Sequence, residues 1–132
     1  PDRFRSCIIQ QETYLFTCQK YIEMNPVRAE MVQQPGEYRW SSYSRNACGE
    51  KSDVIKPHFL YQELGETRKE RQDAYQALFR HELNTAEIDG IRKNTNGGFS
   101  LGDNRFHTEI SQMLGRRVVS GKAGRPKKKQ EK

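Results

Sequence analysis

The Asn25-Pro26 pair constrains this chain most, because it interrupts a stretch whose apolar spacing is typical of a helix. A proline pushes the preceding residue out of the α region, so this helix is predicted to end near Met24. Asn25 is then suited to cap, and Pro26 to begin, a second short helix over residues 26–33. The sequence therefore predicts two helices joined at a fixed bend, with Tyr21 and Asn25 one turn apart as a candidate site.

The rest of the chain is predicted to be nearly all α-helical. Leu15, Cys18 and Ile22 recur at helical spacing and mark the inward face of the first helix. Cys7-Ile8-Ile9 is compatible with the end of a short strand or with a buried turn. Capping residues, apolar spacing and stop residues place four further helices, over residues 41–49, 67–83, 84–94 and 103–115.

Composition favours a soluble, cytoplasmic protein that is a piece of a longer chain. The chain begins with Pro-Asp-Arg-Phe and contains neither a signal peptide nor an apolar run near 18 residues, so no membrane partner is expected. Leu, Ile, Val and Phe make up about 19% of the residues, near the limit for burying a core. Cys7, Cys18 and Cys48 lack the spacing of a disulfide framework or a zinc site, which indicates reduced thiols.

Positive charge is concentrated at the end of the chain. Residues 116–132 contain eight Lys or Arg and one acidic residue. Residues 1–115 contain fifteen Lys or Arg and sixteen acidic residues. Such a tail is typical of a disordered segment that binds a polyanion, with nucleic acid the first expectation. Gly124-Arg125-Pro126 resembles an AT-hook core, but Ala123 replaces the usual preceding arginine, which leaves a general phosphate-binding arm. The candidate DNA-binding residues of this tail are Arg116, Arg117, Lys122, Arg125, Lys127, Lys128 and Lys129.

Tyr21 and Asn25 admit two interpretations. A phenol is a poor nucleophile unless a base or a metal assists it, and an amide oxygen such as that of Asn25 is a hard, neutral metal ligand. Attack on a phosphodiester needs positive charge on the non-bridging oxygens. On chemistry alone the simpler interpretation is favoured, in which Tyr21 lies at the edge of the core and Asn25 is a helix cap.

The segments YLFTCQKYIEMNPVRAEMV and YRWSSY change this weighting, because together they resemble the REP-associated tyrosine transposases, single-tyrosine members of the HUH transposases. The resemblance is dense over residues 3–43 and looser over residues 60–126. It implies that Tyr21 is the nucleophile that forms a 5′-phosphotyrosine link to single-stranded DNA. It also implies that Asn25 is one ligand of a Mg²⁺ or Mn²⁺ ion, whose other ligands come from a His–hydrophobic–His strand of a ferredoxin-like sheet.

This chain departs from the family in its histidines. His58, His81 and His107 all follow Tyr21, and none has the His–hydrophobic–His spacing. The resemblance therefore predicts the helical C-terminal part of an α+β (ferredoxin-like) transposase domain, inactive without an upstream segment that carries the missing strand. The expected parts are the nucleophile helix and aromatic corner (1–49), a linker (50–66), a helical extension (67–115) and the basic tail (116–132).

The remaining candidate residues fit single-stranded or hairpin DNA as the partner. Trp40 is suited to stacking on splayed bases, although packing of its ring onto the nucleophile helix is the favoured alternative. Arg28 and Arg39 are suited to phosphate contacts, but a solvated face explains them equally well. The rival function is that of a non-catalytic DNA-binding protein whose helices are a scaffold for the tail. A homo-oligomer is compatible with the sequence.

Overall fold

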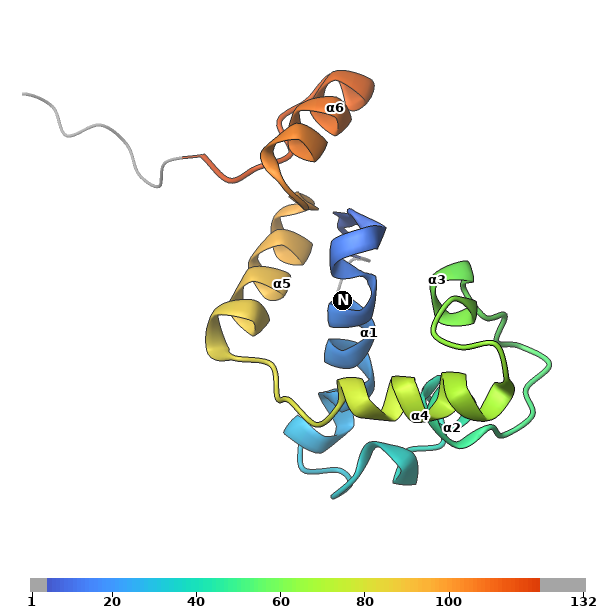
Figure 1. The fold of residues 1–132 in the computed structure, drawn as a ribbon. Coiled ribbons are helices and arrows are strands. Elements are labelled where there is room, and N and C mark those ends of the chain that lie inside the picture. Colours follow the sequence, from blue (N-terminus) through green and yellow to red (C-terminus); the bar gives the residue numbers. More distant parts are fainter. Residues whose placement is uncertain (1–4, 122–132) are drawn as a thin grey trace, which may run out of the picture.

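The computed structural model describes residues 5–121, and it is mainly helical, as predicted (Figure 1). Among the described residues, none of the helices is both long enough and apolar enough to cross a lipid bilayer. The elements follow in the order β1 (Ile8–Ile9), α1 (Gln11–Arg28), the 3-10 turn η1 (Pro35–Glu37), α2 (Tyr43–Cys48), α3 (Phe59–Gln62), α4 (Arg68–Leu78), α5 (Thr85–Gly97), β2 (Ser100–Leu101) and α6 (Asn104–Leu114).

Helix α1 continues through Pro26 to Arg28, so the predicted end near Met24 and the second helix over residues 26–33 are wrong. A proline inside a helix removes the hydrogen bond to the carbonyl one turn earlier. Pro26 lies in the last turn, where a single bond is lost, and its ring is buried. This burial outweighs the local preference of Asn25 for extended backbone. Asn25 is consequently a helical residue and not an N-cap.

The end of α1 has the hydrogen bonds of a Schellman motif. The Met31 N–H donates to the Pro26 carbonyl at 2.9 Å, and the Glu30 N–H donates to the Val27 carbonyl at 3.0 Å. Glu30 adopts the left-handed conformation, with a φ of 58°, at the position that glycine usually takes. Met31, the next residue, is 65% exposed. The motif pairs the last carbonyls of the helix and turns the chain toward η1.

The core lies between α1, α2, α3 and α4 and consists largely of aromatic rings. Ala47 of α2, Tyr61 of α3 and Tyr75 of α4 are its most buried members. The Tyr75 ring lies 6.3 Å from that of Phe16, 5.6 Å from that of Tyr61 and 5.4 Å from that of Phe79, measured between centroids. Aromatic side chains bury a large area each, which explains how a chain poor in aliphatic residues still forms a core.

The buried stripe of α1 is displaced by one residue from the predicted one. Phe16 packs on the core, and Glu23 of the same stripe is fully buried. Leu15 and Cys18 are half-buried, whereas Ile22 is 59% exposed, so its predicted inward position is wrong. Apolar spacing alone misses this stripe because one of its members is a carboxylic acid.

Capping boxes begin α4 and α5, as the sequence predicts. The Thr67 hydroxyl oxygen accepts a hydrogen bond from the Glu70 N–H at 3.1 Å, and Asn84 Oδ1 accepts one from the Glu87 N–H at 2.8 Å. Helix α4 ends at Leu78 and not near Leu83. An N-cap residue needs extended backbone, so the chain must leave α4 before it reaches Asn84.

Strands β1 and β2 form a two-stranded parallel sheet, with Ile8 opposite Ser100 and Ile9 opposite Leu101. The first strand falls where the sequence allowed a strand end; the second was not predicted. With two residues each, these strands contribute one small sheet to the described part of the chain, and the larger ferredoxin-like sheet stays a proposal.

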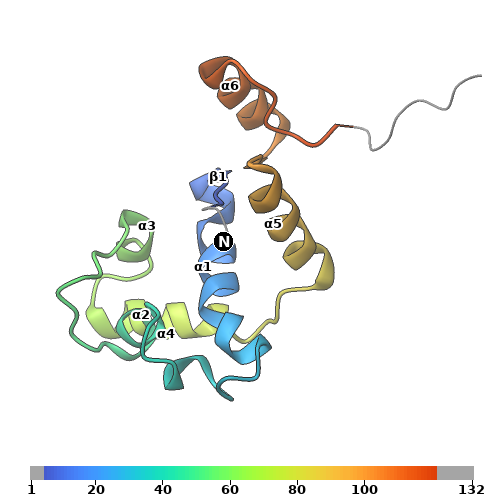
Figure 2. The same ribbon diagram turned by 180° about the vertical axis from the view of Figure 1, so that it is seen from behind.

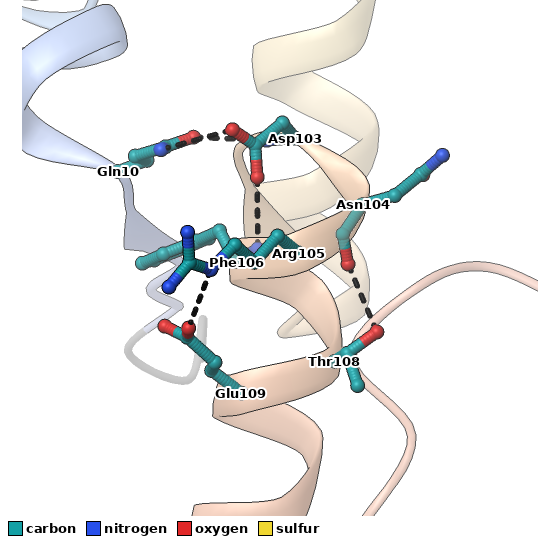
Figure 3. A network of polar contacts seen from close by, with 7 residues as sticks. All are labelled: Gln10, Asp103, Asn104, Arg105, Phe106, Thr108 and Glu109. Carbon is teal, nitrogen blue, oxygen red and sulfur yellow. Dashed lines mark hydrogen bonds and ion pairs between the residues drawn. The ribbon is translucent and has the colours of Figure 1, made fainter.

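Asp103 fastens the start of α6 to the start of α1. Its Oδ1 accepts from the Phe106 N–H at 2.8 Å, which is the predicted N-cap. The Gln10 side chain donates to Asp103 Oδ2 at 3.2 Å and accepts from the Asp103 N–H at 2.9 Å (Figure 3). One turn later Arg105 pairs with Glu109 at 3.1 Å on the exposed face. The Gln10–Asp103 contacts hold α6 above the end of the α1–α5 pair (Figures 1 and 2).

The segment after α6 folds back on the sheet. Val118 is 2% exposed, and its carbonyl accepts from the Ser100 N–H at 2.8 Å. The prediction of a disordered tail beginning at Arg116 is therefore wrong for its first residues, because Val118 gains burial and a backbone hydrogen bond. The remainder of the predicted tail, residues 122–132, lies outside the described residues.

The apolar face of α6 is only partly covered. Phe106 and Ile110 are half-buried, whereas Met113 is 79% and Leu114 45% exposed. Within the described residues, the end of this face is therefore largely open to solvent.

Candidate functional site

Tyr21 lies in the second half of α1, half-buried, with its ring beneath the guanidinium of Arg28. The centre of that guanidinium is 4.5 Å from the ring centroid. Arg28 Nη2 also donates to the Tyr21 carbonyl and, at 2.5 Å, to Asn25 Oδ1. Because Tyr21, Asn25 and Arg28 follow one another at helical spacing, the continuous helix brings together three residues that the sequence singled out.

Arg92 of α5 reaches the same tyrosine from the far part of the chain. Its Nε donates to the Tyr21 hydroxyl at 3.3 Å. Helix α5 lies beside α1 in both views, on the side away from α3 (Figures 1 and 2). Two links at the other end of this pair, from Arg5 to Asn96 at 2.8 Å and between Cys7 and Thr95 at 3.5 Å, keep it in place. Sequence analysis missed Arg92, since no local pattern links it to Tyr21.

The Tyr21 site is electropositive. Burial lowers the pKa of Arg28, the nearby Tyr21 opposes this shift, and the positive charge of Arg92 lowers the pKa further. Within residues 5–121 the ion pair between Arg105 and Glu109 is the only one, so carboxylates do not neutralise Arg28 or Arg92. Arg28 Nε is also buried without a hydrogen-bond partner in this part of the chain. The arrangement suits an anion and disfavours a cation.

The other face of α1 carries Glu23, a buried carboxyl that sequence analysis did not single out. It is 0% exposed and accepts from the Ser42 hydroxyl at 2.5 Å and from the Tyr75 hydroxyl at 2.6 Å. Burial raises the pKa of Glu23, although the hydrogen bonds from Ser42 and Tyr75 act in the opposite direction. Burial and the neighbouring Glu23 also raise the pKa of Tyr75.

Glu23 explains why the two resembling segments belong together. It lies in YIEMNPVRA, and Ser42 lies in YRWSSY, so their hydrogen bond ties α1 to the start of α2. Ser42 is the residue before α2, but its hydroxyl serves Glu23 and does not cap that helix. Gly49 ends α2 in a left-handed conformation, as predicted. The network fixes the orientation of the helix that carries Tyr21.

The described residues do not by themselves form a divalent-metal site. Asn25 Oδ1 already accepts from the Arg28 guanidinium, a cation that would repel Mg²⁺ or Mn²⁺. Over residues 5–121, no three His, Cys, Asp or Glu side chains are grouped as metal ligands. His58 caps α3 and contacts Gln11, and His107 contacts Ser100, so these two imidazoles have structural partners.

Trp40 is 75% exposed, so the favoured interpretation, in which it packs on the nucleophile helix, is wrong. Burial at this corner falls instead on Ser44, Asn46 and Ala47. The Arg39 guanidinium lies over the indole, 4.7 Å from the ring centroid. An exposed indole with a neighbouring cation is a suitable surface for stacking on an unpaired base.

The predicted basic tail is described only at its start. Arg116 is exposed and donates to the Gly98 carbonyl at 3.1 Å, which ties it to the end of α5. Arg117 is also exposed. The candidates that lie outside the described residues are Lys122, Arg125, Lys127, Lys128 and Lys129.

Comparison of the chain with protein-family models, with curated proteins and with solved structures finds no match. The resemblance of the YIEMNPVRA and YRWSSY segments to REP-associated tyrosine transposases stays a prediction from the sequence. What these segments do in this chain is a proposal.

Proposed function

We propose that this chain is the C-terminal part of a transposase that cleaves and joins single-stranded DNA through a tyrosine nucleophile. Tyr21 Oη attacks the phosphorus of a phosphodiester, and the bond from phosphorus to the 3′ oxygen breaks. The products are a 5′-phosphotyrosine and a free 3′-hydroxyl, which receives the phenolic proton by way of solvent. Transfer of the phosphoryl group to another 3′-hydroxyl reverses the sequence and joins the strands.

The observation that carries this proposal is the environment of the Tyr21 hydroxyl. A tyrosine that only lined the core would direct its hydroxyl to a buried acceptor, as Tyr75 does toward Glu23. Tyr21 instead meets an exposed arginine from another helix. Positive charge beside the attacking oxygen stabilises the additional negative charge that forms on a phosphodiester during substitution.

The aromatic corner supports single-stranded DNA as the substrate. The exposed ring of Trp40 can stack on any base that is free of a duplex. The adjacent Arg39 adds charge for the backbone of the same strand. Hydrogen bonding of Ser42 to Glu23 fixes this corner relative to the Tyr21 helix.

The complete protein needs an upstream segment with the His–hydrophobic–His strand. That segment would supply the principal ligands of Mg²⁺ or Mn²⁺, which would place positive charge on the phosphate oxygens. Asn25 could be a further ligand only if its amide oxygen were not paired with Arg28. The chain alone is expected to be inactive.

A non-catalytic DNA-binding protein is the second candidate. The observation that favours it is the absence of a metal-ligand cluster within residues 5–121, together with the excess of Lys and Arg over acidic residues at the end of the sequence. In that case Tyr21 is a structural residue, and DNA binding does not depend on its hydroxyl.

Covalent attachment to DNA distinguishes the two candidates. The chain is mixed with an upstream segment that carries the histidine strand, and with labelled single-stranded hairpin DNA and Mn²⁺. We expect a protein–DNA adduct that survives denaturing electrophoresis with the original sequence and with Tyr14→Phe. It is lost with Tyr21→Phe, which removes one oxygen and keeps the ring. An adduct that persists in Tyr21→Phe would exclude Tyr21 as the nucleophile.

A further inference from the structure

Two arginines from distant parts of the chain converge on Tyr21. Arg28 belongs to the same helix, whereas Arg92 belongs to α5, in the extension that follows the proposed catalytic region. Arg28 covers the tyrosine ring, and Arg92 donates to its hydroxyl at 3.3 Å. The Tyr21 side chain is therefore bordered by two guanidinium groups, that of Arg28 over the ring and that of Arg92 at the hydroxyl.

The charge of this pair is unbalanced. Like charges repel, and the positive charge of Arg92 adds to burial in lowering the pKa of Arg28. Neither arginine has a carboxylate partner within residues 5–121. An anion that reached both guanidiniums would relieve this repulsion.

Donor groups are also left over at the site. A guanidinium carries five N–H donors. The hydrogen bonds of Arg28 within the described residues both use Nη2, and that of Arg92 uses Nε. Arg28 Nε is buried, so Arg28 can offer Nη1 to a ligand, whereas Arg92 keeps both of its Nη groups. The Nη pair of Arg92 has the planar arrangement that matches two oxygens of one phosphate group.

We propose that Arg92 and Arg28 together bind one backbone phosphate of single-stranded DNA beside the Tyr21 hydroxyl, which makes α5 part of the DNA-processing site. This inference rests on the proposed function, which it deepens by giving the helical extension a role. The contacts of α5 with Arg5 and Cys7 then serve to hold Arg92 in position. A phosphodiester is the expected ligand because its two non-bridging oxygens share one negative charge and can accept from both arginines.

Binding by the full chain tests the role of Arg92 without any catalytic step. Fluorescence anisotropy measures the affinity for a labelled single-stranded oligonucleotide over a range of salt concentrations. Arg92→Ala should weaken binding about tenfold and reduce the salt slope by roughly 0.7, the value for one phosphate contact on a single strand. Lys93→Ala is the matched control, because Lys93 is the exposed neighbour on α5 and carries the same charge. It should change the affinity less than about twofold.

Nuclear magnetic resonance of the arginine Nε–H groups tests whether Arg28 and Arg92 both contact the phosphate. The Nε–H resonances of Arg28 and Arg92 are assigned by their loss in Arg28→Lys and Arg92→Lys. Both should shift on addition of the oligonucleotide, and neither should shift with a methylphosphonate oligonucleotide, whose backbone is neutral. Arg92→Lys keeps the charge but not the planar fork, so its affinity should lie between those of the original chain and Arg92→Ala.

Three results would overturn the inference. The first is that Arg92→Ala and Lys93→Ala weaken DNA binding equally, and the second is that Arg92→Ala does not weaken DNA binding. The third is that the Nε–H resonances shift with inorganic phosphate but not with the oligonucleotide. The adduct assay separates this failure from failure of the proposed function. If the Tyr21 adduct forms while Arg92→Ala binds normally, only the phosphate site is wrong. If Arg92 contributes as expected but no adduct forms, the phosphate site stands and the transposase assignment fails.

Discussion

Replacement of Tyr75 by phenylalanine tests whether the buried Glu23 network holds α1, the helix that carries Tyr21, in place. The change removes one hydroxyl that donates to Glu23 Oε2 at 2.6 Å and keeps a ring that is only 1% exposed. The ring contacts with Phe16, Tyr61 and Phe79 remain. Loss of a hydrogen bond to a buried charged group should lower the free energy of unfolding by about 1.5–3 kcal/mol. At about 4 °C per kcal/mol, this corresponds to a Tm roughly 6–12 °C lower.

The free energy of unfolding that Tyr75→Phe loses should depend on pH, because the Tyr75 hydroxyl forms its strongest hydrogen bond with the ionised carboxylate of Glu23. Burial raises the pKa of Glu23, and the Tyr75 hydroxyl opposes that rise. A raised folded-state pKa means that the contribution of Glu23 to stability is complete below its unfolded pKa, about 4.3, and is lost as pH rises through the folded value. Tyr75→Phe should raise the folded pKa further. The variant should therefore lose more stability at pH 8 than at pH 5.

Urea unfolding of both proteins at the two pH values measures this difference directly. Tyr43→Phe is the matched control, because the Tyr43 ring also packs in the core, 4.8 Å from that of Phe79 between centroids. Its hydroxyl has no hydrogen-bond partner within residues 5–121, so its loss should change the free energy of unfolding by less than about 0.5 kcal/mol. Equal losses in the two variants, or a Tyr75→Phe loss that is the same at both pH values, would refute the reasoning.

Three further predictions follow from single side chains. Glu30→Gly should stabilise the chain by about 1 kcal/mol in thermal unfolding, because Glu30 holds a φ of 58° that glycine adopts without strain; a lower Tm would contradict this. Glu23→Gln should flatten the pH dependence of the free energy of unfolding between pH 5 and pH 8, and an unchanged slope would place its origin elsewhere. Trp40→Ala should weaken single-stranded DNA binding about tenfold while Trp40→Phe retains most of it, and oligonucleotide binding should quench Trp40, the single tryptophan. Unchanged Trp40 fluorescence at saturation would argue against stacking.

Local signals in the sequence predicted the beginnings of the later helices well. Thr67, Asn84 and Asp103 each cap the helix that their spacing indicated, because a cap depends on residues three positions apart. The turn at Pro26 could not be decided in the same way. Its local preference for a helix end is outweighed by burial of its ring and by the Schellman motif, which depend on the packed fold.

Side chains whose partners lie far away in the sequence were the ones missed. A glutamate in this sequence context is expected at the surface, and only the fold brings Ser42 and Tyr75 to the Glu23 carboxyl. No local pattern in the sequence distinguishes Arg92 from the other charged residues, and only the packing of α5 beside α1 brings it to Tyr21. Packing of Trp40 onto the Tyr21 helix is the favoured prediction, but Trp40 is exposed and the core is filled by other rings. Tyr21 is a candidate from its position one turn before Asn25, but only the resemblance of its segment favours it as a nucleophile, since its local chemistry favours a structural role.

The most direct test of the central claim is to identify the amino acid that carries DNA after the reaction. The adduct formed with the upstream segment, hairpin DNA and Mn²⁺ is digested with nuclease and trypsin and sequenced by tandem mass spectrometry. Trypsin cleaves after Lys20 and Arg28, so Tyr14 and Tyr21 fall in separate peptides, 6–20 and 21–28. The account predicts a deoxynucleoside 5′-phosphate on Tyr21 in peptide 21–28. The same modification on Tyr14, or on any other residue of this chain, would contradict it.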